Sequence, residues 1–232
     1  MTFAGPHRGL GLAALLGLCA CTTALSPKAP PSSRPAPVTN GKQQRFYDSG
    51  AKQIEIEYRN GREHGAWVSW YESGAKEAEG AFKAGKKHGL WVSWWENGKK
   101  KMEGRFQDGA RVGLWVSWYE NGQKEMEGRY EADRDEGRWT RWYKNGQKQS
   151  EGEYRAGQRQ GLWSFWHENG KKQSEGRYVD DKEEGRWVSW HGNGQKETEG
   201  EYHKGQKVGD WPEWDPEGKP VEPAPEPAEQ EE

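Results

Sequence analysis

The chain has 232 residues, in which 35 Lys and Arg nearly balance 37 Asp and Glu, for a net charge of −2. This balance disfavours nucleic-acid binding, which requires a positively charged surface. Gly, Trp and Tyr are abundant whereas Leu, Ile and Val are scarce, so the chain lacks the residues of an ordinary aliphatic core. We therefore expect local stacking between repeats to stabilise it.

The N-terminal residues predict export and a lipid anchor. Leu10 to Leu18 is an apolar run too short to span a bilayer as a permanent helix, and the only two cysteines follow it. The sequence from Leu18 to Cys21 resembles the bacterial lipoprotein signal, with a large apolar residue three before the modified Cys and a small residue just before it. Cys21 fits because Ala20 precedes it, whereas Cys19 would place Leu18 at the cleavage position.

We therefore predict a signal peptide over residues 1–20 and lipidation of Cys21. Ordinary cleavage to a soluble secreted protein and a disulfide are the alternatives. In a Gram-negative bacterium, the absence of Asp after Cys21 resembles lipoproteins released to the outer membrane, so we expect a cell-envelope location there, facing the periplasm or the surface. Residues 21–44 are Pro-rich and predict a semi-rigid linker that holds the rest of the chain off the membrane.

A strict 24-residue period governs residues 45–218. A second Trp follows the first after three residues, and an Asn-Gly turn comes next in most repeats. A second strand then carries a Gly with an aromatic residue two positions later, and a polar connection leads to another Gly before the next Trp. Such a period is typical of repeat proteins, and Asn-Gly between strand patterns predicts a β-hairpin. The first Trp residues are Trp67, Trp91, Trp115, Trp139, Trp163, Trp187 and Trp211.

One repeat is thus one hairpin, and the sequence predicts an all-β repeat array. Helix is almost excluded, because each of the several Gly residues per repeat would cost about 1 kcal/mol relative to Ala in a helix. Seven complete units follow a half unit, Phe46 to Tyr58. They are expected to form one cooperative array rather than several domains.

The register within a hairpin can be proposed, although it is not forced. If Asn97-Gly98 is a two-residue turn with positive φ, Trp91 lies opposite Gly104, and each large ring lies over a glycine. Gly128 would in the same way lie under Trp115, and rings of neighbouring repeats would stack at roughly 4.5 to 7 Å. A three-residue loop with a bulge would shift the pairing by one.

Strand alternation places Trp91 and Trp95 on one face and Trp94 on the other. The face with Trp94, Glu103 and Lys101 is expected to be wet, with Lys and Arg stems lying along indoles. The second Trp of each repeat is a candidate binding surface, although stacking between repeats also explains every conspicuous Trp. The candidate residues are Trp70, Trp94, Trp118, Trp142, Trp166 and Trp190.

The C-terminal residues 219–232 are rich in Pro and Glu and predict a disordered, solvated tail. Pro212, Pro216 and Pro220 lie close to it. Because proline cannot donate to a sheet ladder, these residues should blunt the last edge strand against pairing with another molecule.

The recurring polar residues argue against catalysis. A Glu series and a Lys series return once per unit, whereas a catalytic acid is needed once, and members two strands apart would lie roughly 10 Å from each other. We interpret them as cross-strand ion pairs. His167 and His191 occupy an aromatic position and His64 and His88 a turn position, so they do not predict a metal site. We expect no enzyme activity, no catalytic residue, no metal and no cofactor.

The unit from Gly113 to Tyr130, Gly-x-Trp-x-x-Trp-Tyr-x-Asn-Gly-x-Lys-x-x-Glu-Gly-x-Tyr, resembles the bacterial variant of the MORN repeat, the membrane occupation and recognition nexus hairpin. The resemblance covers roughly residues 46–218 and implies an elongated, twisted, single-layer antiparallel sheet. Asp133 and Asp181 depart from it by replacing Gly in the outer connection. Residues 211–214 form a degraded last unit.

The resemblance also bears on function, because such repeats serve as scaffolds, partner-binding surfaces and reported lipid binders. Our leading hypothesis is a non-enzymatic, lipid-anchored scaffold that binds a protein or an envelope partner. One alternative is a glycan- or peptidoglycan-binding module that stacks sugars on its Trp rows. Another is an antitoxin or immunity protein against a secreted toxin, which rests on the family label alone. A fold does not fix a function.

Overall fold

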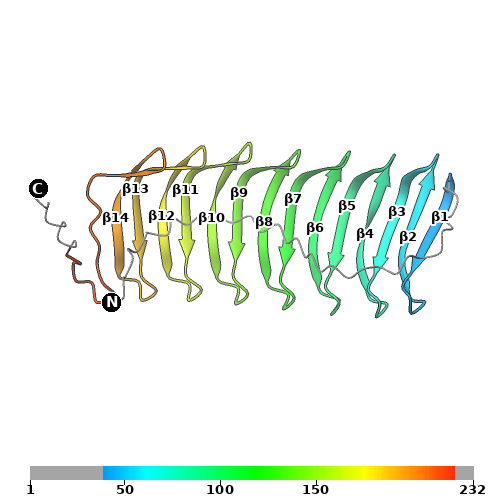
Figure 1. Ribbon diagram of the computed structural model, residues 1–232, viewed down its shortest axis with the longest axis horizontal. Helices are drawn as coiled ribbons and strands as arrows, with labels where there is room; N and C mark the ends of the chain where they lie inside the picture. Colours follow the sequence, from blue (N-terminus) through cyan, green and yellow to red (C-terminus); the bar gives the residue numbers. More distant parts are fainter. Residues whose placement is uncertain (1–38, 223–232) are drawn as a thin grey trace, which may run out of the picture. The chain divides into compact units, whose positions relative to one another are not determined.

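The computed structural model describes residues 39–222, so the predictions for the signal peptide, for Cys19 and Cys21 and for the end of the tail lie outside the described residues. Within them, 15 strands form one open antiparallel sheet in which each strand pairs with its neighbours in the chain (Figure 1). No helix occurs between residues 39 and 222. The predicted all-β array of hairpins is confirmed.

The strands are β1 (Asn40–Phe46), β2 (Lys52–Arg59), β3 (Arg62–Trp70), β4 (Lys76–Lys83), β5 (Lys86–Trp94), β6 (Lys100–Gln107), β7 (Ala110–Trp118), β8 (Lys124–Glu131), β9 (Arg134–Trp142), β10 (Lys148–Arg155), β11 (Gln158–Trp166), β12 (Lys172–Val179), β13 (Lys182–Trp190), β14 (Lys196–His203) and β15 (Gln206–Val208).

The first hairpin, β1 and β2, is complete but differs from the later ones. β1 begins at Asn40, so the sheet starts before the boundary at residue 45 that we expected, and the array does not open on a half unit. Gln43 takes the template position of the first Trp, and Ile56 takes that of the second-strand Gly. Gln43 lies opposite Ile56, which is 5% exposed. The array thus begins on a polar residue instead of an indole, as capping repeats do.

The turn after the second Trp is a three-residue loop, so our model of a two-residue turn is wrong. In the hairpin of β5 and β6, Trp95 N donates to Lys99 O at 2.8 Å and Gly98 N donates to Trp95 O at 2.9 Å. Gly98 has a φ of +81°, whereas Asn97 does not have a positive φ. A left-handed glycine that closes a three-residue loop is a common hairpin ending.

A bulge just after this loop restores the predicted pairing. Lys101 is an extra residue on β6, where the register shifts by one, and Trp91 lies opposite Gly104 as predicted. Because a bulge re-aims its side chain, Lys101 points to the face of Trp91, where its Nζ lies 4.5 Å from the centre of the Trp95 ring. The prediction that Lys101 shares a face with Trp94 is therefore wrong.

The outer connections between hairpins are the two-residue turns with positive φ at both positions, for example 52° at Ala84 and 83° at Gly85. Asp133 and Asp181 occupy the glycine position at 66° and 67°. The Oδ1 atom of Asp133 accepts hydrogen bonds from the backbone N and the Nε of Arg111 at 3.1 and 2.8 Å, and Asp181 makes the equivalent bonds two repeats later. These bonds offset the strain of a non-glycine residue in this conformation.

Each first Trp from Trp91 onward lies over a glycine, but over the glycine of the preceding hairpin. Between β8 and β9, Gly128 alone faces three residues, Gly137 to Trp139. Gly137 has a φ of +67°, and the bulge brings the Trp139 ring over Gly128, where an added Cβ would lie 2.1 Å from Trp139 Cδ2. Gly128 is opposite Trp115 in register, but the prediction that it lies under the Trp115 ring is wrong.

These indoles alternate with the Phe and Tyr rings of the second strands and form the core. From Phe82 to Trp211, consecutive rings meet edge to face, with centroids 4.9 to 6.2 Å apart and interplanar angles of 74° to 89°. This is a favoured geometry for aromatic pairs. We call the face with these rings the ladder face and the opposite face the lysine face. The most buried indoles, 2 to 8% exposed, are Trp91, Trp115, Trp139, Trp163 and Trp187.

A non-strand segment, residues 209–221, covers the last edge of the sheet. Trp211 lies over Gly200, where an added Cβ would be 2.4 Å from Trp211 Cδ2. Trp214 N donates to Glu197 O on β14 at 2.9 Å. The segment pairs with β14 and offers few donors of its own to a further strand, because three of its residues have no N–H. These residues are Pro212, Pro216 and Pro220.

Candidate interaction surfaces

The second Trp residues, which we predicted as a binding surface, line up along the lysine face and are partly buried. Each indole lies under the Lys ammonium of the preceding hairpin, with Nζ 5.0 to 5.7 Å from the ring centre. One side of each ring is therefore occupied by a cation of the protein itself. The rings are Trp70, Trp94, Trp118, Trp142, Trp166, Trp190 and Trp214, and their cations are Lys52, Lys76, Lys100, Lys124, Lys148, Lys172 and Lys196.

Each of these Lys residues also pairs with the Glu three positions later. The Nζ–Oε2 distance is 2.5 to 3.1 Å along the row, and Lys100 and Glu103 are paired in the same way. A hydrogen bond from Lys196 is the main cause that lowers the pKa of Glu199. Burial raises the pKa of Glu175, but hydrogen bonds from Lys172 and Ser164 outweigh it and leave the pKa below its usual value. Glu175 and Glu199 therefore stay ionised at neutral pH and are poor proton donors for catalysis.

Two of the histidines take part in hydrogen bonds between neighbouring repeats. The Nε2 atoms of His167 and His191 lie 2.8 and 2.7 Å from the carbonyl oxygen of the second Trp in the next repeat, where the hydroxyl of Tyr119 donates the same bond at 2.8 Å. His64 and His88 lie within strands and not in turns, which corrects our prediction. In the described part of the chain, no cluster of three or more His, Cys, Asp and Glu could hold a metal ion.

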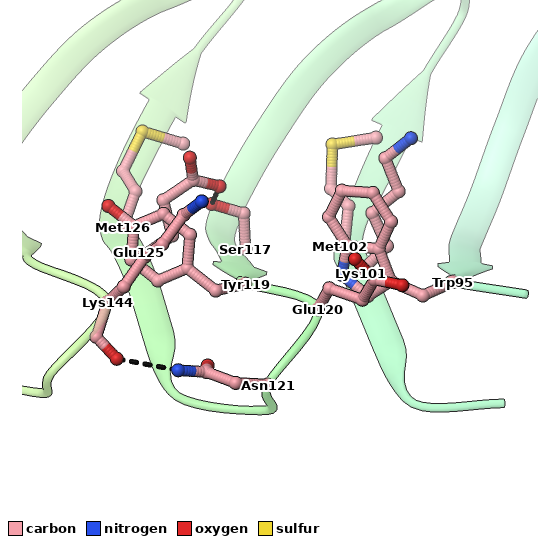
Figure 2. Close-up of a pocket in the computed structure, with 10 residues that line it drawn as sticks. All are labelled: Trp95, Lys101, Met102, Ser117, Tyr119, Glu120, Asn121, Glu125, Met126 and Lys144. Carbon is pink, nitrogen blue, oxygen red and sulfur yellow. Dashed lines mark hydrogen bonds between the residues drawn. The ribbon is translucent and has the colours of Figure 1, made fainter. Parts of the chain in front are cut away.

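A groove of about 740 Å³ opens on the ladder face beside two three-residue loops (Figure 2). Trp95 and Met102 come from one hairpin, and Tyr119 and Met126 come from the next. Figure 2 shows these two groups facing each other across the groove. Met102, one of the residues that line the groove, is 41% exposed.

Charged side chains of both signs lie at this groove: Lys101, Lys144, Glu120 and Glu125 line it, and Arg141 is nearby in the sheet. The Nζ atoms of Lys101 and Lys144 lie 4.5 and 6.0 Å from the ring centres of Trp95 and Tyr119. Arg141 is exposed and lies opposite Met126 in register. None of the three cations forms an ion pair with a carboxylate of residues 39–222.

Sequence reasoning missed this groove, although the signal was present as departures from the 24-residue template. Met102 and Met126 stand where other repeats carry Ile, Ala, Ser or Thr. Lys101 stands where the next repeat has Glu125, and Lys144 stands where the preceding repeat has Glu120. These four residues depart from the template, whereas the other residues that line the groove, such as Tyr119, Glu120 and Asn121, follow it.

The comparisons with known proteins agree with this architecture. A model of the MORN repeat variant family matches residues 39–60, 87–108, 111–132, 135–156 and 159–180, and each matched segment coincides with one hairpin. No curated protein matches the chain. Among the described residues, no helix is long and apolar enough to cross a membrane. MORN repeats indicate a scaffold involved in binding. The chain therefore belongs to the MORN repeat family in its variant form.

Proposed function

We propose that this protein is a non-enzymatic repeat scaffold, tethered to a membrane by a lipid on Cys21, that binds a protein or another component of the cell envelope. The binding role is supported by a difference between two sets of positions in the 24-residue repeat, those that hold the hairpins together and those that do not. The indoles, the glycines beneath the first Trp rings and the loop asparagines hold neighbouring hairpins together, whereas other positions, such as those of Met102 and Lys144, differ from one repeat to the next. Repeat scaffolds present extended binding surfaces in this way.

The absence of enzyme activity is supported by the chemistry of the surfaces. The carboxylates of the lysine face recur in every hairpin and are neutralised by Lys, and the histidines replace Tyr in a structural hydrogen bond. A catalytic site requires a nucleophile, a base and a stabilising group brought together once. The side chains described above are arranged as rows instead.

Glycan binding through the Trp row of the lysine face is a second candidate, favoured by the partial exposure of Trp70, Trp94, Trp118, Trp142, Trp166 and Trp190. Sugars stack on open ring faces, and the Lys ammonium over each indole reduces the area that a sugar could cover. We therefore rank it below a protein partner. A role as an antitoxin or immunity protein is supported only by the family relationship.

Site-specific photo-cross-linking tests the binding role. A photoreactive amino acid is placed at Leu114, which is 50% exposed on the lysine face, or at Met102 on the ladder face, in cells that express the full chain from its own promoter. At least one position should yield a discrete adduct after irradiation, and the same residue placed at Asp210, on the covering segment, serves as the control. Absence of an adduct from both faces contradicts the scaffold proposal.

Metabolic labelling with a palmitate analogue tests the anchor. Cys21→Ser should abolish labelling and leave uncleaved or mislocalised precursor, because Ala20 precedes the modified position and Thr22 follows it. Cys19→Ser should keep the label and is the matched control. Label that survives in the Cys21 variant but disappears in the Cys19 variant would reverse the assignment.

A further inference from the structure

We propose that β1, the first edge of the sheet (Figure 1), is a docking strand for an extended segment of a partner protein, which adds to the array in the place of a preceding hairpin. The inference rests on the proposed binding role and assigns it a place and a mode of binding. The segment follows the pattern of the array's own second strands, a Lys with Glu-Gly three positions later. Within residues 39–222, β1 pairs only with β2, whereas every strand from β2 to β14 pairs on both sides.

Backbone groups on the open side of β1 are available for pairing. At the other end of the array, Trp214 N donates to Glu197 O of the preceding strand. Phe46 holds the template position of Trp214, so its N–H points away from β2, and so does that of Gln44, because backbone groups two residues apart in a strand face the same side. Main-chain hydrogen bonds of this kind give strand addition its affinity.

The backbone of β1 already has the bend that a preceding strand requires. Gly41 has a φ of +105° and holds the template position of Gly137, where one glycine of the preceding strand faces three residues. The three-residue side of such a bulge, Gly41 to Gln43, is thus present on β1. Nothing lies within 4 Å of a Cβ added at Gly41, so the space beside it is open. The glycine of an incoming second-strand segment would complete the bulge.

An incoming lysine also has a place, over the ring of Phe46. At each later interface the aromatic ring at this position lies under a Lys of the preceding strand, for example Trp70 under Lys52 with Nζ 5.0 Å from the ring centre. Phe46 is 55% exposed, and none of the cations in residues 39–222 lies over its ring. A Lys on the added strand would cover the ring and supply the missing contact.

The chain's own linker does not suit this edge. Residues 22–38 contain five prolines, which cannot donate to a ladder. Pro37 holds the template position of Gly61, whose φ is +71° in a two-residue outer turn. Because proline cannot adopt a positive φ, that turn cannot lead from the linker into β1.

A second copy of the chain is a poorer occupant than a different protein. Its C-terminal edge is covered by residues 209–221, so two copies would meet through their β1 strands. β1 carries Lys42 and Arg45 and no carboxylate, and like charges that face each other destabilise paired strands. The nearest carboxylate, Glu55 on β2, is already shared between Lys42 and Lys52 at 3.6 and 3.1 Å. A segment like β14, with three Glu and one Lys, brings the opposite charge.

The test is a binding titration of a fluorescent peptide of residues 194–205, which contains the β14 sequence, against the purified full-length chain. Binding should saturate at one peptide per chain. Gln44→Pro should weaken it at least about tenfold, because it removes an N–H on the open side and leaves the bonds to β2 intact. Gln44→Thr is the matched control. It loses the same side-chain hydrogen bond to Glu55 but keeps the N–H, so it should bind like the wild type. Equal melting temperatures of the two variants check that both fold.

A change in the peptide tests the lysine contact. Replacing the peptide residue that corresponds to Lys196 by Ala should weaken binding to the wild type about two- to fivefold. The same replacement should have no effect on binding to Phe46→Ala, because the ring that the ammonium covers is then absent.

The inference is overturned if the peptide does not bind, or if Gln44→Pro binds it as tightly as Gln44→Thr. It is equally overturned if a peptide of the same composition in scrambled order binds as well. A wild-type dimer in sedimentation velocity that Gln44→Pro dissociates would show that the occupant of β1 is a second copy and not a partner protein.

The cross-linking experiment separates the two proposals. Adducts from Leu114 or Met102, together with failure of the peptide to bind at β1, would leave the scaffold function standing and remove this site. Absence of adducts from both faces would contradict the scaffold proposal whatever the result with the peptide.

Discussion

Gly128 shows how a single residue holds two hairpins in contact. Its missing side chain is the space that the Trp139 ring fills, and an added Cβ would lie 2.1 Å from Trp139 Cδ2. The ring is 3% exposed and touches the neighbouring Tyr130 edge to face. Because the indole is confined on both sides, it cannot move away without breaking contacts of the ladder.

We therefore expect Gly128→Val to destabilise the array by about 1 to 3 kcal/mol through overpacking. Glu127→Ala removes one half-exposed carboxylate from the lysine face and should cost well under 1 kcal/mol. Thermal melts of the two variants make the comparison. If Glu127→Ala lowered the melting temperature as much as Gly128→Val, the Lys–Glu row would be as important for stability as the glycines that lie under the Trp rings.

Two aspartates on β9 and in the turn before it should respond to pH with opposite signs. Burial raises the pKa of Asp135, so its ionised form costs stability at neutral pH, and this cost disappears as the pH falls through the raised pKa toward the ordinary value of 3.8. Hydrogen bonds from Arg111 lower the pKa of Asp133, so its ionised form stabilises the fold above pH 3.8, and this stability is lost as the pH falls through the lowered pKa.

Asp135→Asn should accordingly raise the melting temperature at pH 7, and the gain should shrink toward zero as the pH approaches 3. Asp133→Asn should lower the melting temperature at pH 7 and is the matched control two residues away. Melts at several pH values test both changes. A decrease for Asp135→Asn at pH 7 would show that its contacts with Arg111, Arg141 and Tyr130 outweigh its burial.

At the scale of the element, the three-residue loop links each hairpin to the next as well as closing its own strands. Asn121 Nδ2 donates to Lys144 O of the following loop at 2.6 Å, and its Oδ1 accepts from Gln123 N at 3.0 Å. The same pair of bonds recurs at Asn97, Asn145, Asn169 and Asn193. This recurrence explains why the template keeps Asn even though it does not adopt a positive φ.

Asn121→Ala should therefore destabilise the array by about 0.5 to 1.5 kcal/mol for each net hydrogen bond lost. Asn121→Gly loses the same hydrogen bonds and should destabilise the array by a similar amount. If the turn instead required a positive φ at this position, Asn121→Gly would increase the stability. Chemical denaturation of the three proteins distinguishes these cases. A gain in stability with Gly would indicate that the residue is selected for its backbone conformation.

The element scale also shows what could be predicted from sequence. The opposition of Trp91 and Gly104 followed from the 24-residue template even though the loop was misassigned, because the extra loop residue and the bulge at Lys101 cancel. The prediction for Gly128 was wrong because the pairing of strands within one hairpin does not show which Trp ring, from its own hairpin or from the next, covers the glycine. That depends on the bulge from Gly137 to Trp139 between hairpins.

The groove could not be derived in the same way. It depends on the bulge that turns Lys101 to the ladder face and on the hollow that lies between the side chains of two successive hairpins. Strand alternation alone assigns Lys101 to the wrong face. Four of the residues that line the groove, Lys101, Met102, Met126 and Lys144, were nevertheless visible in the sequence as departures from the period, and alignment of the repeats with one another would have identified these four.

At the scale of the whole sheet, the array is a one-dimensional stack in which each hairpin contacts only its neighbours in chain order. Stability in such a stack is a sum of hairpin and interface contributions, and a defect at the centre interrupts coupling on both sides. Gly128→Val should therefore lower the melting temperature more than Gly200→Val, whose indole partner, Trp211, belongs to the covering segment. An equal loss at both positions would contradict this one-dimensional coupling.

The two ends of the sheet are protected by different means, and the C-terminal one can be removed cleanly. A chain that ends at Gly205 lacks β15 and the segment with Trp211 and Trp214, so Gly200 loses its indole and β14 becomes a bare edge. Exposed edge strands pair with other chains. We expect this truncation to melt at a lower temperature and to self-associate with increasing concentration, as measured by sedimentation velocity. A chain that ends at Glu222 keeps the covering segment and should behave as the wild type. A monomeric Gly205 truncation with unchanged melting temperature would mean that the bridge to β14 and its prolines do not protect this edge, and that β14 is kept from pairing by its own charged residues.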